Sequence, residues 1–295
     1  LGDVYKRQDK YEQPETDFPT DVRTMALQGD TLWIGSLNGL YTYQLNTKKL
    51  ASLDSKSNGL PHHTIYSIIR TTDNQIYVGT YNGLCRYIEE SGKFENIPLP
   101  VNRNVSNLFV NSLLEDTSRQ CIWIGMEGSL FQYTPATGLM KPIDAFHNNS
   151  IKSLALDGDG NLLAGTDNGL YVYQNDNGTL QHIVHDSRNI QSLTNNIIWN
   201  IFADQEQNIW LGTDYGISLS RYNSALQFIP ISQITGTGDG NQFYSLFRDS
   251  KEFYWFGGTN GVIRFTNPTG NKHDAVWYRM GDKHHPLSHN RIRHI

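Results

Sequence analysis

Clustered histidines are the first residues of this chain whose side chains could bind a metal ion. They occur at two places, His62 and His63 in one and His284, His285, His289 and His294 in the other. No helical i, i+4 spacing and no cysteine partner accompanies them, as zinc motifs require. Both groups lie in segments that lead into expected β-strands. We therefore interpret them as loop residues and predict no metal site.

A short acidic segment resembles a calcium-binding loop. Residues 157–161 read DGDGN, which places oxygen ligands on alternate residues. The loop lacks the glutamate that completes an EF-hand loop. It also falls where the other repeats described below carry a hairpin turn. We interpret it as a turn.

Motifs for nucleophilic catalysis and phosphate binding are absent from the sequence. There is no G-x-S-x-G segment, no P-loop and no Cys–His pair in a recognisable context. Carboxylates are plentiful, but no pattern singles out an acid–base pair. We predict no catalytic residue and no cofactor.

Composition narrows the class of protein further. The net charge of −5 argues against a nucleic-acid partner, and no apolar run approaches the length of a membrane span. Few charged residues, 26 glycines and 16 tyrosines suit an all-β protein with many tight turns. Cys85 and Cys121 fall at different positions of adjacent repeats. Two small buried hydrophobic residues are favoured over a disulfide.

A repeated pattern must position these residues. Six times an aromatic–aliphatic–glycine strand runs into a short turn, with first glycines at Gly35, Gly79, Gly125, Gly165, Gly212 and Gly257. A period of about 40–50 residues with several short strands is typical of a β-propeller blade. We predict an all-β propeller of four-stranded blades over residues 21–295. It comprises six repeats and the first strand of a seventh, as part of a seven-bladed ring.

The fifth copy shows the expected plan of one blade. It predicts an inner strand at 196–203, a hairpin turn at 204–208, further strands at 209–213 and 217–222, and an outer strand near 226–229. The aromatic column, Trp33, Tyr77, Trp123, Leu163, Trp210 and Trp255, is interpreted as packing between blades. The first glycine of each copy either allows close approach of a neighbouring sheet or supports a bulge.

Comparison of the inner strands separates uniform columns from a variable one. One column is apolar in every copy, and the position before it is small or polar in most. One position further back the copies differ, with Tyr66, Asn111, Lys152, Trp199, Tyr244 and Arg293. Such a column is free of packing demands and is a candidate to face the central channel. Aromatic faces there suit sugar rings, and amides and cations suit hydroxyls or carboxylates. Channel lining without a ligand fits equally well.

The segment GLPHHTIYSIIRTTDNQIYVGTYNGLCRY, at 59–87, closely resembles the two-component regulator propeller repeat. That pattern runs leucine-proline, inner strand, D-x-x-G-N, L-W-I-G-T and x-x-G-L, and the resemblance covers nearly all of 21–295. The D-x-x-G-N turn departs in several copies, which bears on turn geometry. In that family the repeats form two seven-bladed propellers in the periplasmic sensor half of hybrid sensor kinases, which respond to oligosaccharides.

The resemblance implies a non-catalytic sensor propeller that binds an oligosaccharide and relays to a histidine kinase elsewhere in its parent chain. The implied partners are a second propeller, a membrane-proximal domain and a second copy in a homodimer. The implied location is the periplasm, as part of an inner-membrane receptor. A polysaccharide lyase or glycosidase and a protein-interaction scaffold stay as alternatives, because the fold alone does not decide function.

The beginning of the sequence has its own interpretation. Residues 3–8 read DVYKRQ, which a sequencing-library adaptor encodes in one reading frame. We therefore expect residues 1–8 to be an artefact and exclude them from the fold. Residues 9–20 are expected to be a linker or the end of a preceding blade.

Overall fold

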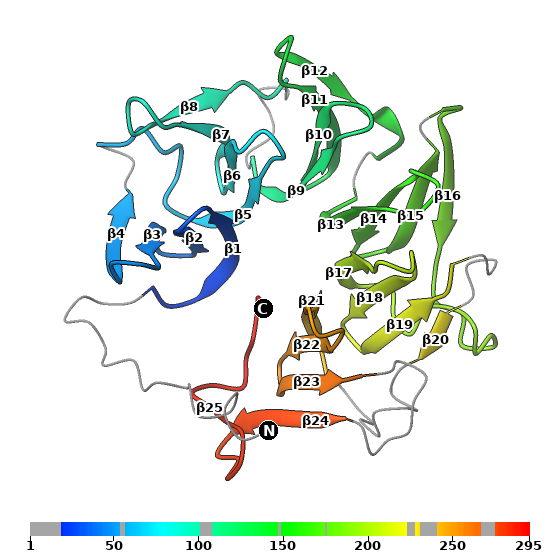
Figure 1. Cartoon of the computed structure of the whole chain (residues 1–295). Coiled ribbons are helices and arrows are strands. Elements are labelled where there is room, and N and C mark those ends of the chain that lie inside the picture. Colours follow the sequence, from blue (N-terminus) through cyan, green and yellow to red (C-terminus); the bar gives the residue numbers. More distant parts are fainter. Residues whose placement is uncertain are drawn as a thin grey trace.

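The computed structural model describes residues 19–53, 57–100, 108–146, 149–174, 176–222, 228–230, 241–266 and 275–295 (Figure 1). Residues 1–8 and most of 9–20 lie outside this set, so their interpretation as an adaptor artefact and a linker stays a prediction. The described residues form one all-β ring of sheets.

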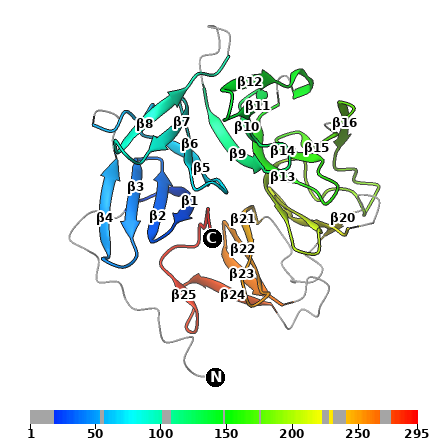
Figure 2. The same ribbon diagram turned by 45° about the horizontal axis from the view of Figure 1, so that its top comes forward.

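Six antiparallel meanders of four strands form the blades of a propeller (Figures 1 and 2). The first three blades are β1 (Val22–Gln28), β2 (Thr31–Ser36), β3 (Leu40–Gln44) and β4 (Lys49–Leu53), then β5 (Ile65–Arg70), β6 (Ile76–Thr80), β7 (Gly83–Ile88) and β8 (Lys93–Ile97), then β9 (Val110–Asp116), β10 (Cys121–Met126), β11 (Ser129–Thr134) and β12 (Leu139–Pro142). A 3-10 turn, η1 (Asp144–Phe146), follows. The other three are β13 (Ile151–Leu156), β14 (Leu162–Thr166), β15 (Gly169–Gln174) and β16 (Thr179–Ile183), then β17 (Ile198–Ala203), β18 (Ile209–Thr213), β19 (Gly216–Ser220) and β20 (Phe228–Pro230), then β21 (Phe243–Arg248), β22 (Tyr254–Gly258), β23 (Gly261–Phe265) and β24 (Val276–Met280). The predicted fold class is confirmed.

The first strand of each blade faces the centre of the ring, and these inner strands contact one another in sequence order (Figure 1). In the fifth blade the second strand has its predicted bounds. The third strand ends at Ser220, two residues earlier than expected, and the outer strand lies at Phe228–Pro230. Fold and strand order therefore follow the repeat closely.

After β24 the chain makes a short strand, β25 (Pro286–Leu287), which pairs in parallel with β24 and gives blade 6 a fifth strand. Residues 291–295 are assigned no strand, yet they take the path of the expected seventh inner strand. The Ile292 amide donates to the carbonyl of Gly258 at 2.9 Å, and the Ile295 amide donates to Ser245 Oγ at 2.9 Å. No second strand pairs with them among the described residues, which is why they form no ladder.

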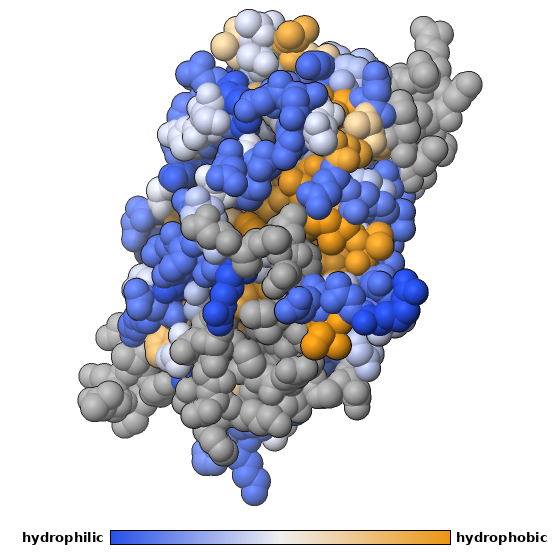
Figure 3. Space-filling view, turned by 90° about the vertical axis from the view of Figure 1, so that its right-hand side faces the viewer, coloured by the Kyte–Doolittle hydropathy of each residue, from blue (hydrophilic) through white to orange (hydrophobic). Residues whose placement is uncertain are grey.

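The apolar core lies between successive sheets, because each blade is too thin to bury its own faces. Figure 3 shows the outer side of the blades at the right of Figure 1, where hydrophilic residues cover most of the described surface around an oblique hydrophobic band. The aromatic column is buried as expected at its first five positions: Trp33, Tyr77, Trp123, Leu163 and Trp210. Trp255 differs, since it is partly exposed in the sixth blade.

Each buried tryptophan of this column also satisfies its indole N–H. Trp123 Nε1 donates to Asp116 at 3.1 Å and Trp210 Nε1 donates to Asp204 at 2.9 Å. In these two blades the acceptor is the aspartate that opens the hairpin turn before the second strand, whereas Trp33 Nε1 donates to Gln28 Oε1 at 3.0 Å. Both cysteines are buried and unbridged, as favoured from the sequence.

The calcium-like loop is a hairpin turn, as interpreted. Its first residue, Asp157, accepts the backbone N–H groups of Asp159 at 3.0 Å and Asn161 at 2.8 Å through Oδ1. Its carboxylate is therefore used by the turn itself.

Candidate functional site

A β-bulge interrupts every inner strand at the same place. In blade 4 the ladder pairs Ile151 with Thr166 and Ser153 with Gly165, so Lys152 is the extra, unpaired residue. The same shift leaves Arg23, Tyr66, Asn111, Trp199 and Tyr244 unpaired in the other blades. A bulge frees its extra residue from the ladder and redirects its side chain. Five of the six residues of the variable column are therefore bulge residues, and Arg293 takes the corresponding place in 291–295, where no ladder forms. Together with Arg23 these residues are named the bulge column.

The repeat's first glycine makes room for this geometry. A Cβ on Gly165 would lie 2.6 Å from Ile198 Cγ2 of the next blade, and one on Gly125 would lie 2.6 Å from Ile151 Cγ2. Ile198 and Ile151 each precede a bulge residue. Both roles considered for the glycine hold, because it faces the bulged strand of its own blade and lets the next inner strand pack closely.

The small polar column ties neighbouring inner strands together. Ser153 Oγ accepts the backbone N–H of Ile201 in the next blade at 3.0 Å. Thr24 Oγ1 accepts that of Ile68 at 3.2 Å. Ser245 Oγ accepts the backbone N–H of Ile295 in the same way at 2.9 Å, whereas Ser67 Oγ donates to the carbonyl of Val110 at 3.1 Å. Each of these bonds joins two neighbouring inner strands near their bulges.

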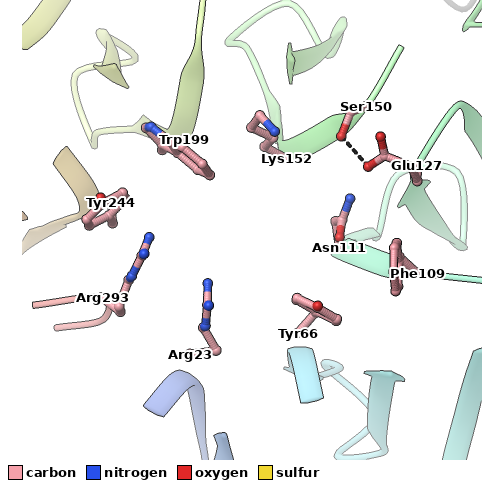
Figure 4. A pocket seen from close by; sticks show the side chains of 10 residues that line it. All are labelled: Arg23, Tyr66, Phe109, Asn111, Glu127, Ser150, Lys152, Trp199, Tyr244 and Arg293. Atoms are coloured by element: carbon pink, nitrogen blue, oxygen red, sulfur yellow. Dashed lines mark hydrogen bonds between the residues drawn. The ribbon is translucent and has the colours of Figure 1, made fainter. Parts of the chain in front are cut away.

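One central cavity of about 290 Å³ collects the bulge side chains (Figure 4). All six candidate residues named from the sequence line it, together with four others: Arg23, Phe109, Glu127 and Ser150. The structure thus brings the predicted residues of six separate repeats to one place.

Four of these side chains form a continuous stack of cations and rings. Lys152 Nζ lies 4.8 Å from the centroid of the Trp199 ring, and the Trp199 and Tyr244 centroids are 5.4 Å apart in an edge-to-face arrangement. Arg293 Cζ lies 3.8 Å from the centroid of Tyr244. Trp199 is only partly buried, so part of its ring borders the cavity. Cation–π pairs of this kind contribute roughly 0.5–2 kcal/mol each.

A hydrogen-bonded brace holds the two rings of this stack. Asp214 Oδ1, from the turn between β18 and β19, accepts Trp199 Nε1–H at 3.0 Å and Gln242 Nε2–H at 2.6 Å. Gln242 Oε1 in turn accepts the Tyr244 hydroxyl. The indole N–H of Trp199 and the hydroxyl of Tyr244 thus both have hydrogen-bond acceptors.

The opposite wall of the cavity is aromatic and polar (Figure 4). Tyr66 and Phe109 meet at 5.7 Å between ring centroids. Ser150 donates its hydroxyl to Glu127 Oε2 at 2.5 Å. Glu127 belongs to the third repeat, whose turn has its glycine one place early, and the structure places this carboxylate in the cavity wall.

Sequence comparison missed four lining residues for two reasons. Arg23 occupies the bulge of the first repeat. The inner strand of that repeat is not among the six that the variable column compares, which begin at Tyr66. Phe109, Glu127 and Ser150 come from seams, where the second turn of one blade meets the segment before the next inner strand. The turn position itself varies among copies, as Leu37, Tyr81, Glu127, Asp167, Asp214 and Thr259, and that variation was the available signal.

Positive charge predominates in the cavity. Arg23, Lys152 and Arg293 line it with Glu127 as the one carboxylate among the lining residues. Burial lowers the pKa of Arg293; Tyr244 opposes this effect, while Arg23 and Arg291 add to it. The cavity therefore offers fixed donors, two aromatic walls and one carboxylate acceptor, which is a set suited to a polyhydroxylated ligand.

No cluster of three or more His, Cys, Asp or Glu side chains suited to a metal ion occurs among the described residues. No helix within the described ranges is long and apolar enough to cross a membrane.

Comparisons with known proteins agree with this architecture. The two-component regulator propeller model matches residues 59–82 and 192–215. Histidine kinase P4 of Formosa agariphila is 30% identical, over 83% of this chain and 19% of its own length. The extracellular domain of a hybrid two-component system from B. thetaiotaomicron is 82% identical, with a TM-score of 0.69 over 96% of this chain and 38% of its own. Virginiamycin B lyase of Staphylococcus aureus, 13% identical with a TM-score of 0.67 over 92% of this chain and 89% of its own, shows the fold alone.

Six meander blades around a lined channel define this chain as a β-propeller. Two of its repeats, at 59–82 and 192–215, match the two-component regulator propeller, as the sequence resemblance predicted. Of the relatives named above, the extracellular domain of the hybrid two-component system is the most similar to this chain in sequence. The chain spans well under half the length of either relative, 19% of the kinase and 38% of the extracellular domain.

Proposed function

We propose that this propeller is a non-catalytic sensor module that binds an oligosaccharide in its central cavity. The observation that carries the proposal is the bulge column. Six repeats agree at their packing positions and differ at the bulge position, whose side chains meet in a cavity. Packing would favour similar residues there, whereas recognition of an asymmetric ligand favours different ones.

The chemistry of the lining residues supports a sugar. The apolar face of a sugar ring packs against aromatic side chains such as Trp199 and Tyr66, on opposite walls of the cavity. Its hydroxyl groups accept hydrogen bonds from Lys152 and Arg293 and donate to the amide oxygen of Asn111 or to Glu127. The sequence carries no recognisable nucleophile motif or acid–base pair, so binding is proposed in preference to turnover.

We propose the following route for the signal. The parent chain would be a periplasmic receptor anchored in the inner membrane, with a second propeller, a membrane-proximal domain and a histidine kinase, acting as a homodimer. A ligand changes the balance between two receptor states only if it binds one of them more tightly. Ligand contacts that bridge several blades provide such a difference, because they depend on how the blades pack around the cavity.

The test is binding of the purified 295-residue chain to an array of plant, host and microbial glycans, followed by calorimetry on the glycans retained. Trp199→Ala and Tyr244→Ala should each weaken binding about threefold to tenfold, the equivalent of roughly 0.5–1.5 kcal/mol for one aromatic contact. Tyr222→Ala is the control, since Tyr222 is 42% exposed and does not line the cavity.

Each other outcome contradicts a specific part of the proposal. Release of shortened glycan products would favour a lyase or glycosidase. Absence of binding to every glycan of the array would favour a protein-interaction scaffold. Binding that both alanine variants retain in full would place the site elsewhere on the propeller.

A further inference from the structure

A continuous row of aromatic rings leads from the cavity to the rim between blades 2 and 3. It consists of Tyr66, Phe109, Tyr81, His62 and His63, here named the aromatic strip. The centroids of Phe109 and Tyr81 lie 4.1 Å apart, those of Tyr81 and His62 4.9 Å, and those of His62 and His63 4.3 Å. Tyr66 and Phe109 line the cavity, and the other three rings extend beyond it.

Packing of the fold does not account for the strip. None of its five residues belongs to a buried hydrophobic cluster of the described structure. Tyr81 is 36% exposed, and His63 is exposed as well. The position of Tyr81 carries Leu37, Glu127, Asp167, Asp214 and Thr259 in the other blades, so the repeat does not require an aromatic ring there.

The outer part of the strip is held by backbone contacts. His62 Nδ1 accepts the backbone N–H of Thr64 at 3.0 Å, and the Tyr81 backbone N–H donates to the Thr64 carbonyl at 3.0 Å. Thr64 Oγ1 donates to the carbonyl of Leu37 in blade 1 at 3.0 Å. Burial, and the neighbouring His63, lower the pKa of His62, so this ring is neutral at pH 7. The strip is thus an anchored and largely uncharged surface.

The cavity is too small to hold a sugar chain of several units. At about 290 Å³ the cavity lies at the lower end of the roughly 300–1,000 Å³ typical of small-ligand sites. A sugar chain of several units must therefore leave it. The strip is the aromatic path from the cavity to the rim that the described contacts trace.

We propose that the aromatic strip is a second subsite, which binds those units of an oligosaccharide that extend beyond the cavity. This inference rests on the proposed function. Apolar sugar faces would pack against the exposed ring surface, and sugar hydroxyls would bond to the polar edges of tyrosine and histidine. The affinity gained with each added sugar unit would then come from the strip at the rim, and not from the unit held in the cavity.

The experiment measures dissociation constants against length series, from two to six units, of cello-, xylo-, arabino- and galacto-oligosaccharides. The unsubstituted chain should bind the longest member of its preferred series more tightly than the disaccharide. Tyr81→Ala and His63→Ala should weaken binding of the hexasaccharide about threefold to tenfold and leave the disaccharide unchanged. Tyr215→Ala is the matched control, because Tyr215 is a 53% exposed tyrosine in the turn of another blade.

Failure of this inference and failure of the proposed function give different results. If the unsubstituted chain binds no glycan, either in these series or on the array of plant, host and microbial glycans, the proposed function fails and the subsite with it. If it binds, and Tyr81→Ala keeps the full gain with length, the subsite alone is wrong. Equal weakening of the disaccharide and the hexasaccharide by Tyr81→Ala would also overturn it, since it would indicate a general change in the cavity.

Discussion

The carboxylate of Asp214 accepts the indole N–H of Trp199 at 3.0 Å, and so a turn of blade 5 fixes a ring that borders the cavity. The same oxygen accepts a hydrogen bond from Gln242 Nε2–H, and Gln242 Oε1 accepts one from the Tyr244 hydroxyl. Asp214→Ala should therefore release both rings together. We expect stronger quenching of Trp199 fluorescence by acrylamide and a weaker near-ultraviolet circular dichroism signal.

The control for this prediction is Asp214→Asn, which keeps an oxygen acceptor for the indole N–H and should retain most of the signal. Because Trp199 is one of six tryptophans, each spectrum is compared with that of Trp199→Ala. If Asp214→Ala leaves quenching and circular dichroism unchanged, the brace does not position the rings.

The fold and much of the cavity wall could be predicted because repeats serve as internal controls for one another. Trp33 and Trp123 sit at the same packing position, so their similarity indicates a shared core role. Lys152 and Trp199 sit at the same bulge and differ, which indicates freedom from packing. A single copy would have carried neither signal.

What could not be predicted depends on contacts between different columns. Glu127 reaches the cavity wall because the turn of blade 3 meets Ser150 at the start of blade 4. Phe109 does so because Tyr81 and Tyr66 pack on it from two elements of blade 2. Such seams join positions that no single aligned column contains. A bulge was one of the two roles considered for the first glycine, but its position in the inner strand, at Trp199 in blade 5, follows only from the pairing of the strands.

Close packing at the first glycine yields a prediction about stability. Gly165→Ala would place a Cβ 2.6 Å from Ile198 Cγ2, so one of the two sheets must shift. Overpacking of this kind costs about 1–3 kcal/mol. For a chain of this size each kcal/mol lowers the melting temperature by roughly 2–4 °C.

A double-mutant cycle with Ile198→Ala tests the cause. Ile198→Ala removes Cγ2 together with the rest of the side chain beyond Cβ, which relieves the 2.6 Å contact. The double variant should therefore be more stable than the sum of the two single effects predicts. Strict additivity would mean that Gly165→Ala acts through something other than this contact.

A strained turn offers a stabilising substitution. Gln120 has a φ of +50°, which costs a non-glycine residue about 1–2 kcal/mol, and Gly160 occupies the equivalent position of blade 4 with a φ of +77°. Gln120→Gly should raise the unfolding free energy by roughly 0.5–1 kcal/mol, after the larger entropy of glycine in the unfolded chain is subtracted. Chemical denaturation measures the change.

The reciprocal variant, Gly160→Ala, is the control and should lower stability by about 1 kcal/mol. A Cβ there would lie 3.7 Å from the nearest atom, so sterics do not obscure the backbone effect. If Gln120→Gly is destabilising, the turn gains more from the glutamine side chain than it loses in strain.

Acid should destabilise the propeller through His294, next to the bulge-column residue Arg293. Burial lowers the pKa of His294 below its ordinary value of 6.5, so the folded state binds its proton less readily than the unfolded state. Stability is therefore fully present above about pH 6.5 and is lost as the pH falls from there toward the folded pKa. The melting temperature should be lower at pH 5.0 than at pH 7.5.

Other groups contribute to that fall, so the specific measurement is the difference that His294→Asn makes. Asn200 fills the same column in blade 5, so asparagine fits the position. His294→Asn should reduce the acid-induced fall, whereas His284→Gln, at an exposed histidine, should not. An equal fall in the unsubstituted chain and His294→Asn would show that this imidazole does not set the acid sensitivity.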